Sequence, residues 1–133
     1  AATAREALGR SGEAQPVATV TPSLGPKGWD RTGNATDHVL VCAGPRCHFR
    51  DAPRLRMLLA EEARAAGILK TCQFTETSCL GPCNRGPLVA HYPEGTWYTL
   101  RDAEDVRRFV AAALVERSGG EELISHRLPR VEA

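Results

Sequence analysis

The sequence has few aromatic residues, little net charge and no long apolar run, and each absence excludes a class of function. Aromatic residues make up 5% of the 133 positions, too few for the stacking platform that single-stranded nucleic acids require. The net charge of +1 gives no electrostatic reason to bind nucleic acid or a membrane surface. No apolar run approaches the ~20 residues of a transmembrane helix. We therefore expect no nucleic-acid partner and no membrane partner.

Other missing signals bear on compartment and activity. Residues 1–6 lack the basic start and apolar stretch of a secretory signal, so a cytoplasmic location is expected. An odd number of cysteines, five, argues against a framework built only of disulfides. The sequence has no phosphate-binding glycine loop and no recognisable nucleophile–base pair, so it predicts a protein that is not an enzyme.

What the sequence does have is two close pairs of cysteines. Cys42 and Cys47 are separated by four residues, Cys79 and Cys83 by three, and 31 residues lie between the pairs. The first pair follows the apolar run 39–41, which is typical of a buried strand. The second pair encloses Leu80-Gly81-Pro82, a sequence that favours a loop.

The remaining patterns predict a mixed α/β domain. Strands are expected at 38–42, 68–75, 87–92 and 96–99, and helices at 51–66 and 102–116, with 122–127 as a short last strand or an ordered tail. Asp51 is the candidate N-cap of the first helix, Pro53 falls in its first turn, and Gly67 is its stop. Because a strand–helix–strand unit gives a parallel pair and a short turn gives an antiparallel one, we expect a mixed sheet. This domain spans 37–133.

Residues 1–36 differ from the domain, because eight of them are Gly or Pro and their apolar residues are scattered. We expect a loosely structured extension with Trp29 as its anchor, or an arm that binds a partner.

Two strands that leave the same edge of a sheet bring both cysteine pairs to one place, and four thiolates bind either zinc or an iron–sulfur cluster. Zinc knuckles favour a separation of two residues, whereas a [2Fe-2S] cluster tolerates longer loops. The plant-type ferredoxin pattern fails, since position 50 is Arg50. A cluster, a zinc ion and a redox-active thiol pair all remain open from the spacing alone. No two-residue cysteine pair opens the first helix, which weakens the third alternative.

Several other residues have an expected role. Cys72 is expected to be a buried, inert thiol, and His48 is a remote alternative ligand beside Cys47. His91 and His126 are expected to be structural, and Trp97 and Tyr98 are expected to pack in the hairpin of strands 87–92 and 96–99 or at a dimer face. The positions in or beside the cysteine loops carry more positive than negative charge, either as a solvated rim or as a surface for an acidic partner: Arg46, His48, Arg50, Lys70 and Arg85 against Asp51 and Glu76.

The cysteine loops, the following segment 86–89 and the hairpin segment 92–98 together resemble the thioredoxin-like [2Fe-2S] ferredoxins, a family that includes the Shethna-type ferredoxins and is related to the cluster subunit of respiratory complex I. The resemblance covers about 37–127. It implies a thioredoxin-like fold with a mixed four- to five-stranded sheet and helices packed on it. It also implies that the cysteines of both pairs ligate the iron of a [2Fe-2S] cluster: Cys42, Cys47, Cys79 and Cys83.

The implied function is one-electron transfer between redox partner proteins, as a homodimer whose interface involves the hairpin or the Trp97 face. Alternatives are a zinc-binding module for protein interaction and a ferredoxin that protects or regulates a larger redox enzyme by forming a complex with it. Residues 1–36 leave no room for the helical domain of the complex I subunit, so a stand-alone ferredoxin is expected.

Overall fold

The computed structural model describes residues 9, 33–129 and 131, and its strands form one five-stranded sheet in the order β2-β1-β3-β4-β5. The strands are β1 (Asp37–Cys42), β2 (Cys72–Thr77), β3 (Leu88–Tyr92), β4 (Thr96–Thr99) and β5 (Ile124–Arg127). The helices are α2 (Pro45–Phe49), α3 (Ala52–Ala65) and α4 (Ala103–Phe109), with a π-helix η3 (Val110–Glu116) and two 3₁₀ turns, η2 (Cys83–Arg85) and η4 (Glu121–Leu123). The expectation of a mixed α/β sheet is confirmed.

Strand β1 is central to the arrangement. It runs parallel to β2 and antiparallel to β3, with Cys42 opposite Thr77 and Val41 opposite Val89. The segments 43–50 and 78–87 therefore leave the sheet at the same end, as predicted. We call this end, with those two segments, the sulfur end. The opposite end of β1, where Asp37 faces Cys72 across the β1–β2 ladder, is called the Asp37 end.

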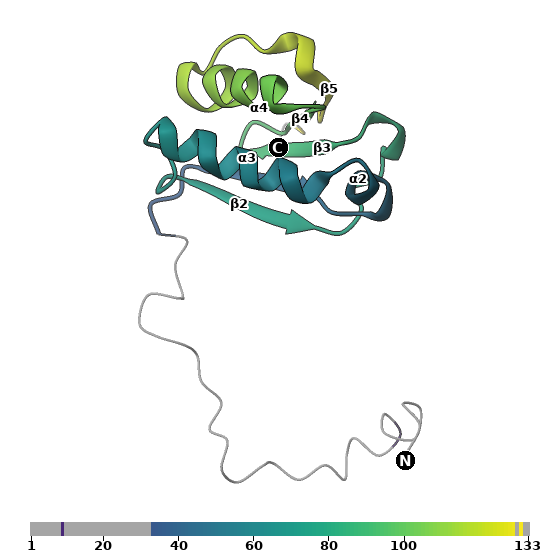
Figure 1. The fold of residues 1–133 in the computed structure, drawn as a ribbon. Helices are drawn as coiled ribbons and strands as arrows, with labels where there is room; N and C mark the ends of the chain where they lie inside the picture. Colours follow the sequence, from purple (N-terminus) through teal and green to yellow (C-terminus); the bar gives the residue numbers. More distant parts are fainter. Residues whose placement is uncertain (1–8, 10–32, 130, 132–133) are drawn as a thin grey trace, which may run out of the picture. The chain divides into compact units, whose positions relative to one another are not determined.

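The core lies between one face of the sheet and the helices α3, α4 and η3. Figure 1 shows α3 and α4 side by side over this face. Alternate residues of the strands point into the core, because side chains in a strand alternate between its faces. The fully buried members are Val39, Val41, Leu59, Val89, Leu100, Val106 and Phe109.

The start of the second strand was predicted wrongly. Residues 68–71 do not extend the strand: Ile68 completes the end of α3, and 69–71 form a turn closed by bonds from the amides of Thr71 and Cys72 to the carbonyl of Ile68. The amide of Ile68 bonds to the carbonyl of Ala63 and the amide of Gly67 bonds to the carbonyl of Arg64, while Gly67 has φ +75°. This is a Schellman motif, in which the apolar residue after the glycine packs back on the core. The apolar Ile68 thus closes a helix, and β2 starts at Cys72.

The helix boundaries also differ in detail from the prediction. The first cysteine loop contains a short helix, α2, and Asp51 then separates it from α3 with a left-handed backbone, φ 67°. Asp51 occupies the N-cap position of α3 but its side chain makes no capping bond. Asp102 does cap α4, accepting from the amide of Asp105 at 2.9 Å. The last predicted helix continues from α4 into η3, and the last strand is β5.

The predicted extension, residues 1–36 with Trp29 as anchor, lies outside the described residues except for its last four positions and Gly9. Within the described part of the chain, no helix is long and apolar enough to cross a membrane.

Candidate metal centre at the sulfur end

The structure brings four cysteines to the sulfur end. Cys42 is the last residue of β1 and Cys47 lies in α2, and both are buried. Cys79 follows β2 and is exposed, while Cys83 begins η2 and is half-buried. The four thiols thus form one pair inside the protein and one pair at its surface.

Close contacts hold the two cysteine loops together. The amide of Ala43 donates to the carbonyl of Thr77 at 2.8 Å. A Cβ built on Gly44 would lie 2.8 Å from Cα of Cys79, a separation that real Cβ atoms essentially never show. Only a residue without a side chain permits this approach of the two backbones. Glycine at position 44 is therefore what lets the first loop reach the second.

A second glycine leaves room beside a buried thiol. A Cβ at Gly86 would lie 2.7 Å from Sγ of Cys47. Nearby, the Arg50 guanidinium donates to the carbonyl of Cys83 at 2.8 Å and to that of Gly86 at 3.1 Å. Arg50 thereby fixes the turn that carries the surface pair against the end of α2.

The thiols contact one another and backbone amides. Sγ of Cys79 lies 3.3 Å from Sγ of Cys83, and Sγ of Cys42 lies 3.8 Å from the carbonyl oxygen of Ser78. The amide of Leu88 donates to Cys47 and that of Gly81 donates to Cys79. Amide donors of this kind stabilise negative charge on sulfur.

The surroundings shift the pKa values of these thiols in different directions. Burial, with the neighbouring Cys42, raises the pKa of Cys47 to about 11. The bond from Cys83, together with the amide of Gly81, lowers the pKa of Cys79, and the same contact with Cys79 raises the pKa of Cys83. The exposed Cys79 is therefore the member of the surface pair that ionises first.

The chemistry of the donors at the sulfur end suits an iron–sulfur cluster. As placed, no three of the described His, Cys, Asp or Glu side chains are grouped to hold a metal ion. Four soft sulfur donors, two amides directed at sulfur and glycines that leave space on the inner side are what a [2Fe-2S] cluster requires. These residues fit the group that the sequence predicts.

Cys72 lies away from this site. It begins β2 at the Asp37 end and belongs to the main core, with 5% of its surface exposed. Burial raises its pKa to about 12. This thiol is chemically quiet, as the sequence predicted, and it is separated from the other four by the length of β2.

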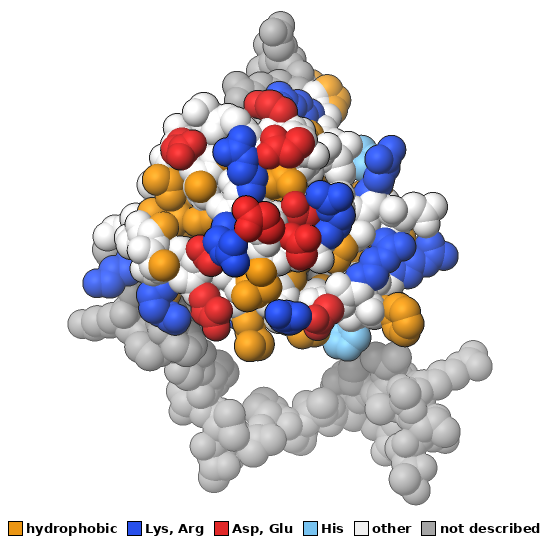
Figure 2. Space-filling model, turned by 45° about the horizontal axis from the view of Figure 1, so that its top comes forward, with side chains coloured by type: hydrophobic (Ala, Val, Ile, Leu, Met, Phe, Trp, Pro, Cys, Tyr) orange, Lys and Arg blue, Asp and Glu red, His pale blue; other side chains and the backbone are white. Residues whose placement is uncertain are grey.

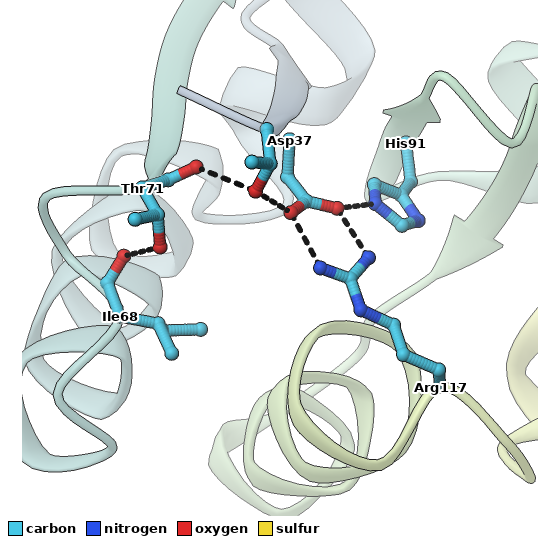
Figure 3. Close-up of polar contacts among 6 residues, drawn as sticks. Asp37, Ile68, Thr71, His91 and Arg117 are labelled. Atoms are coloured by element: carbon cyan, nitrogen blue, oxygen red, sulfur yellow. Dashed lines mark hydrogen bonds and ion pairs between the residues drawn. The ribbon is translucent and has the colours of Figure 1, made fainter. Parts of the chain in front are cut away.

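The sequence did not reveal the polar network at the Asp37 end. The buried Asp37 carboxylate accepts from both terminal nitrogens of Arg117, at 2.5 and 2.6 Å, from Nε2 of His91 at 2.6 Å and from the hydroxyl of Thr36 at 2.8 Å. In Figure 3, Arg117 reaches Asp37 from the end of the helix and His91 from a strand. The Arg117 guanidinium holds the pKa of Asp37 well below its usual range, although burial acts in the opposite direction.

A signal for this network exists in the strands. Residues two positions apart in a strand lie on the same face. Asp37 therefore shares a face with the buried Val39, and His91 shares one with the buried Val89. A polar residue on an apolar face needs a buried partner. The distant Arg117 has no such signature, because it lies past the end of the helical pattern, with φ 58°.

Other predicted residues are placed as follows. His48 is exposed on α2, and His126 contacts Ser125 and the ring of Trp97, at a centroid distance of 6.4 Å. The inclusion of Lys70 among the charges near the cysteine loops was wrong, because it precedes β2 and therefore lies at the Asp37 end. Glu76 is paired with Arg56.

Comparison with known proteins gives a consistent result. No protein-family model matches the sequence. A [2Fe-2S] ferredoxin of Clostridium pasteurianum is 29% identical over 85 residues, which span 58% of this chain and 83% of that protein. A [2Fe-2S] ferredoxin of Aquifex aeolicus (strain VF5) is 31% identical over 93 residues, spanning 63% of this chain and 81% of that protein.

Solved structures agree with these relatives. The crystal structure of the thioredoxin-like [2Fe-2S] ferredoxin from Aquifex aeolicus superimposes with a TM-score of 0.64 at 27% identity, covering 70% of this chain and 99% of that one. Crystal structures of two cysteine-to-serine variants of that ferredoxin also match, and the two replaced cysteines are four positions apart in its sequence. Cys79 and Cys83 have the same spacing here.

Proposed function

Because the chain belongs to the thioredoxin-like [2Fe-2S] ferredoxin family, we propose that it holds a [2Fe-2S] cluster at the sulfur end and carries one electron at a time between partner proteins. The proposed ligands are Cys42, Cys47, Cys79 and Cys83. The observation that carries the proposal is the contact of Gly44 with Cys79, which brings the two cysteine loops together at one end of the sheet.

The bound cluster supplies reversible one-electron chemistry at iron. The protein's contribution is to hold the sulfurs rigidly and to stabilise the added negative charge. The amides of Leu88 and Gly81 donate to two of the thiol groups, and the Arg46 guanidinium lies close enough to Cys79 to lower its pKa. These groups favour the reduced state, because each interaction strengthens as negative charge accumulates on sulfur.

The different burial of the four thiols indicates the side of the site at which electrons enter and leave. The inner pair, Cys42 and Cys47, is closed off by Ala52, Leu88 and Leu80, whereas Cys79 is exposed. The surface pair is thus the side from which a partner protein approaches the cluster. The family's role is electron transfer, and we propose that this chain catalyses no reaction of its own.

We place the protein in a reducing compartment, the cytoplasm, since all five cysteines are free thiols. The homodimer implied by the resemblance stays a prediction, as does a protective complex with a larger redox enzyme.

The test is the colour and metal content of protein purified without air. We expect a brown-red protein with equal amounts of iron and acid-labile sulfide, whose visible absorption dithionite bleaches. Cys47→Ser should abolish or strongly change this absorption, and Cys79→Ser should do the same. Cys72→Ser is the matched control and should leave the spectrum unchanged.

Two outcomes would contradict the proposal. A colourless protein that carries zinc in place of iron would identify a structural zinc module. A spectrum lost in Cys72→Ser and kept in Cys47→Ser would show that the ligand set is wrong.

A further inference from the structure

The arginines of the described residues fall into two groups. Six are paired with carboxylates: Arg56, Arg101, Arg107, Arg108, Arg117 and Arg127. Among the described residues, five have no carboxylate partner, and four of these lie at or beside the sulfur end: Arg46, Arg50, Arg54 and Arg85. The fifth is Arg64, in the last turn of α3. Unpaired positive charge is therefore concentrated beside the cysteine loops.

Figure 2 shows the same contrast on one face of the molecule. Over the middle of this face red and blue side chains are interleaved, whereas blue side chains gather at its right-hand edge with few red ones among them. Two carboxylates, Asp51 and Asp102, line the same hollow as Arg50 and Arg54. Asp102 also caps α4, and neither Asp51 nor Asp102 forms an ion pair with an arginine among the described residues.

Only some of these arginines interact with the thiols or the backbone of the cysteine loops. Arg46 acts on the thiol of Cys79, and Arg50 is bonded to two loop carbonyls. Arg54 and Arg85 have exposed side chains that make no hydrogen bond to the cysteine loops within the described part of the chain. Their charge is directed at solvent.

An exposed aromatic residue lies within this group. Phe49, the last residue of α2, is 92% exposed, the highest value among the large apolar side chains of the domain together with Val131. It stands between His48 and Arg50 in the chain and two positions after Cys47. An aromatic anchor surrounded by a charged rim is the composition of a protein-binding surface.

Taking the cluster of the proposed function as given, we propose that the sulfur end is a docking surface for an acidic electron-transfer protein, with Phe49 at its centre and Arg54 and Arg85 in its rim. Acidic side chains of the partner pair with the unpartnered arginines, and an apolar patch of the partner covers Phe49. Docking in this orientation brings the partner's redox centre to the exposed side of the site, next to Cys79 and Cys83.

The test measures electron transfer from the dithionite-reduced protein to two acceptors of opposite charge, an acidic plastocyanin and a basic cytochrome c, by stopped flow. With plastocyanin the bimolecular rate should fall as ionic strength rises, by on the order of tenfold between low and physiological salt. With cytochrome c it should stay flat or rise.

Charge-reversal variants locate the effect. The double change Arg54→Glu with Arg85→Glu should slow transfer to plastocyanin by about tenfold and speed transfer to cytochrome c. The matched control is Arg64→Glu with Lys70→Glu, which alters the charge equally at the Asp37 end and breaks no ion pair between described residues. It should change either rate less than about twofold. Phe49→Ser should slow electron transfer to plastocyanin and leave the dependence of that rate on ionic strength unchanged.

The visible spectrum separates this proposal from the one it rests on. A variant that lacks the [2Fe-2S] spectrum tests only the proposed cluster. The docking surface is tested only by variants whose cluster is intact and reducible. Equal effects of the two double variants on plastocyanin would overturn the docking surface. So would salt-sensitive binding of a single-stranded oligonucleotide that depends on Arg54 and Arg85 while plastocyanin rates stay unchanged.

Discussion

The two ends of strand β1 are built on different principles. At the Asp37 end a buried carboxylate accepts four hydrogen bonds from the side chains of Thr36, His91 and Arg117, and one buried atom of this network, Nδ1 of His91, has no partner among the described residues. At the sulfur end two loops approach closely around free thiols, and two of these are exposed or half-buried. One strand thus joins an end with a buried ion pair to an end with the proposed cluster ligands. Stability and cofactor binding should therefore respond to different substitutions.

The largest effect is expected for Gly44→Ala. The added Cβ would meet the Cys79 backbone at 2.8 Å, and backbone cannot move aside as a flexible side chain can. The two loops must separate, and the cysteine pairs separate with them. We expect the purified protein to have lost most of its iron and its visible absorption, while far-ultraviolet circular dichroism shows that the fold remains.

Gly67→Ala is the control for this substitution. Gly67 ends α3 with φ +75° and has open space around it, so alanine there strains the backbone at a cost of about 1 kcal/mol. It should lower the thermal unfolding midpoint and leave the iron content unchanged. If Gly44→Ala kept its full cluster content, the close approach of the loops would not be needed for the site.

A smaller effect, confined to stability, is expected for Asp37→Asn. The substitution removes the charge that pairs with Arg117, and breaking a buried pair typically costs ~3–5 kcal/mol. Because the Arg117 side chain is 48% exposed, we expect a loss of about 2–3 kcal/mol in the free energy of unfolding. Chemical denaturation measures the loss, and the visible spectrum should not change.

The pH dependence of that loss identifies its cause. Arg117 holds the pKa of Asp37 below its usual value, so the stability that the carboxylate contributes is fully present above an aspartate pKa of about 3.9 and fades as pH falls below it. The difference between wild type and Asp37→Asn should be constant from neutral pH to about pH 5 and shrink below about pH 4. A difference that disappeared above pH 6, or loss of the cluster in this variant, would show that the two ends are not independent.

The smallest effect is expected for Arg50→Gln, which removes the guanidinium bonds to the carbonyls of Cys83 and Gly86. These exposed bonds restrain the loop of the surface pair, so iron release to a chelator should be faster by on the order of fivefold. Arg54→Gln makes the same chemical change a few residues away, where no bond to the loops exists, and should leave the release rate unchanged. Equal rates in both variants would assign the effect to charge alone.

The sequence predicted the features that follow from local patterns. Cysteine spacing and the apolar run before Cys42 indicated the site, and the Pro93–Gly95 turn indicated the β3–β4 pair. The same local patterns gave a wrong prediction at Ile68. An apolar residue after a helix can begin a strand or can pack back to close the helix. The backbone conformation of Gly67 and the bond from the amide of Ile68 to the carbonyl of Ala63 show that it closes the helix.

Features that depend on distant parts of the chain were not predictable. Arg117 pairs with a residue 80 positions away, and the sequence around Arg117 has no pattern that predicts a buried partner. The contact of Gly44 with Cys79 likewise joins two loops whose distance is set by the register of β1 and β2. Phe49 was overlooked because its exposure is a property of α2, a helix that its glycine- and proline-containing surroundings did not suggest.

The position of Gly44 also limits how such a chain can evolve. Its inner side has no room for one carbon atom beside Cys79, whereas the outer side of the same loop, at Arg46 and Phe49, faces water. Insertions between the first two cysteines can therefore be accommodated only by bulging outward, where they would cover or extend the surface rather than disturb the sulfurs. An insertion in this loop would therefore change the surface beside Phe49 and leave the packing around the sulfur atoms in place.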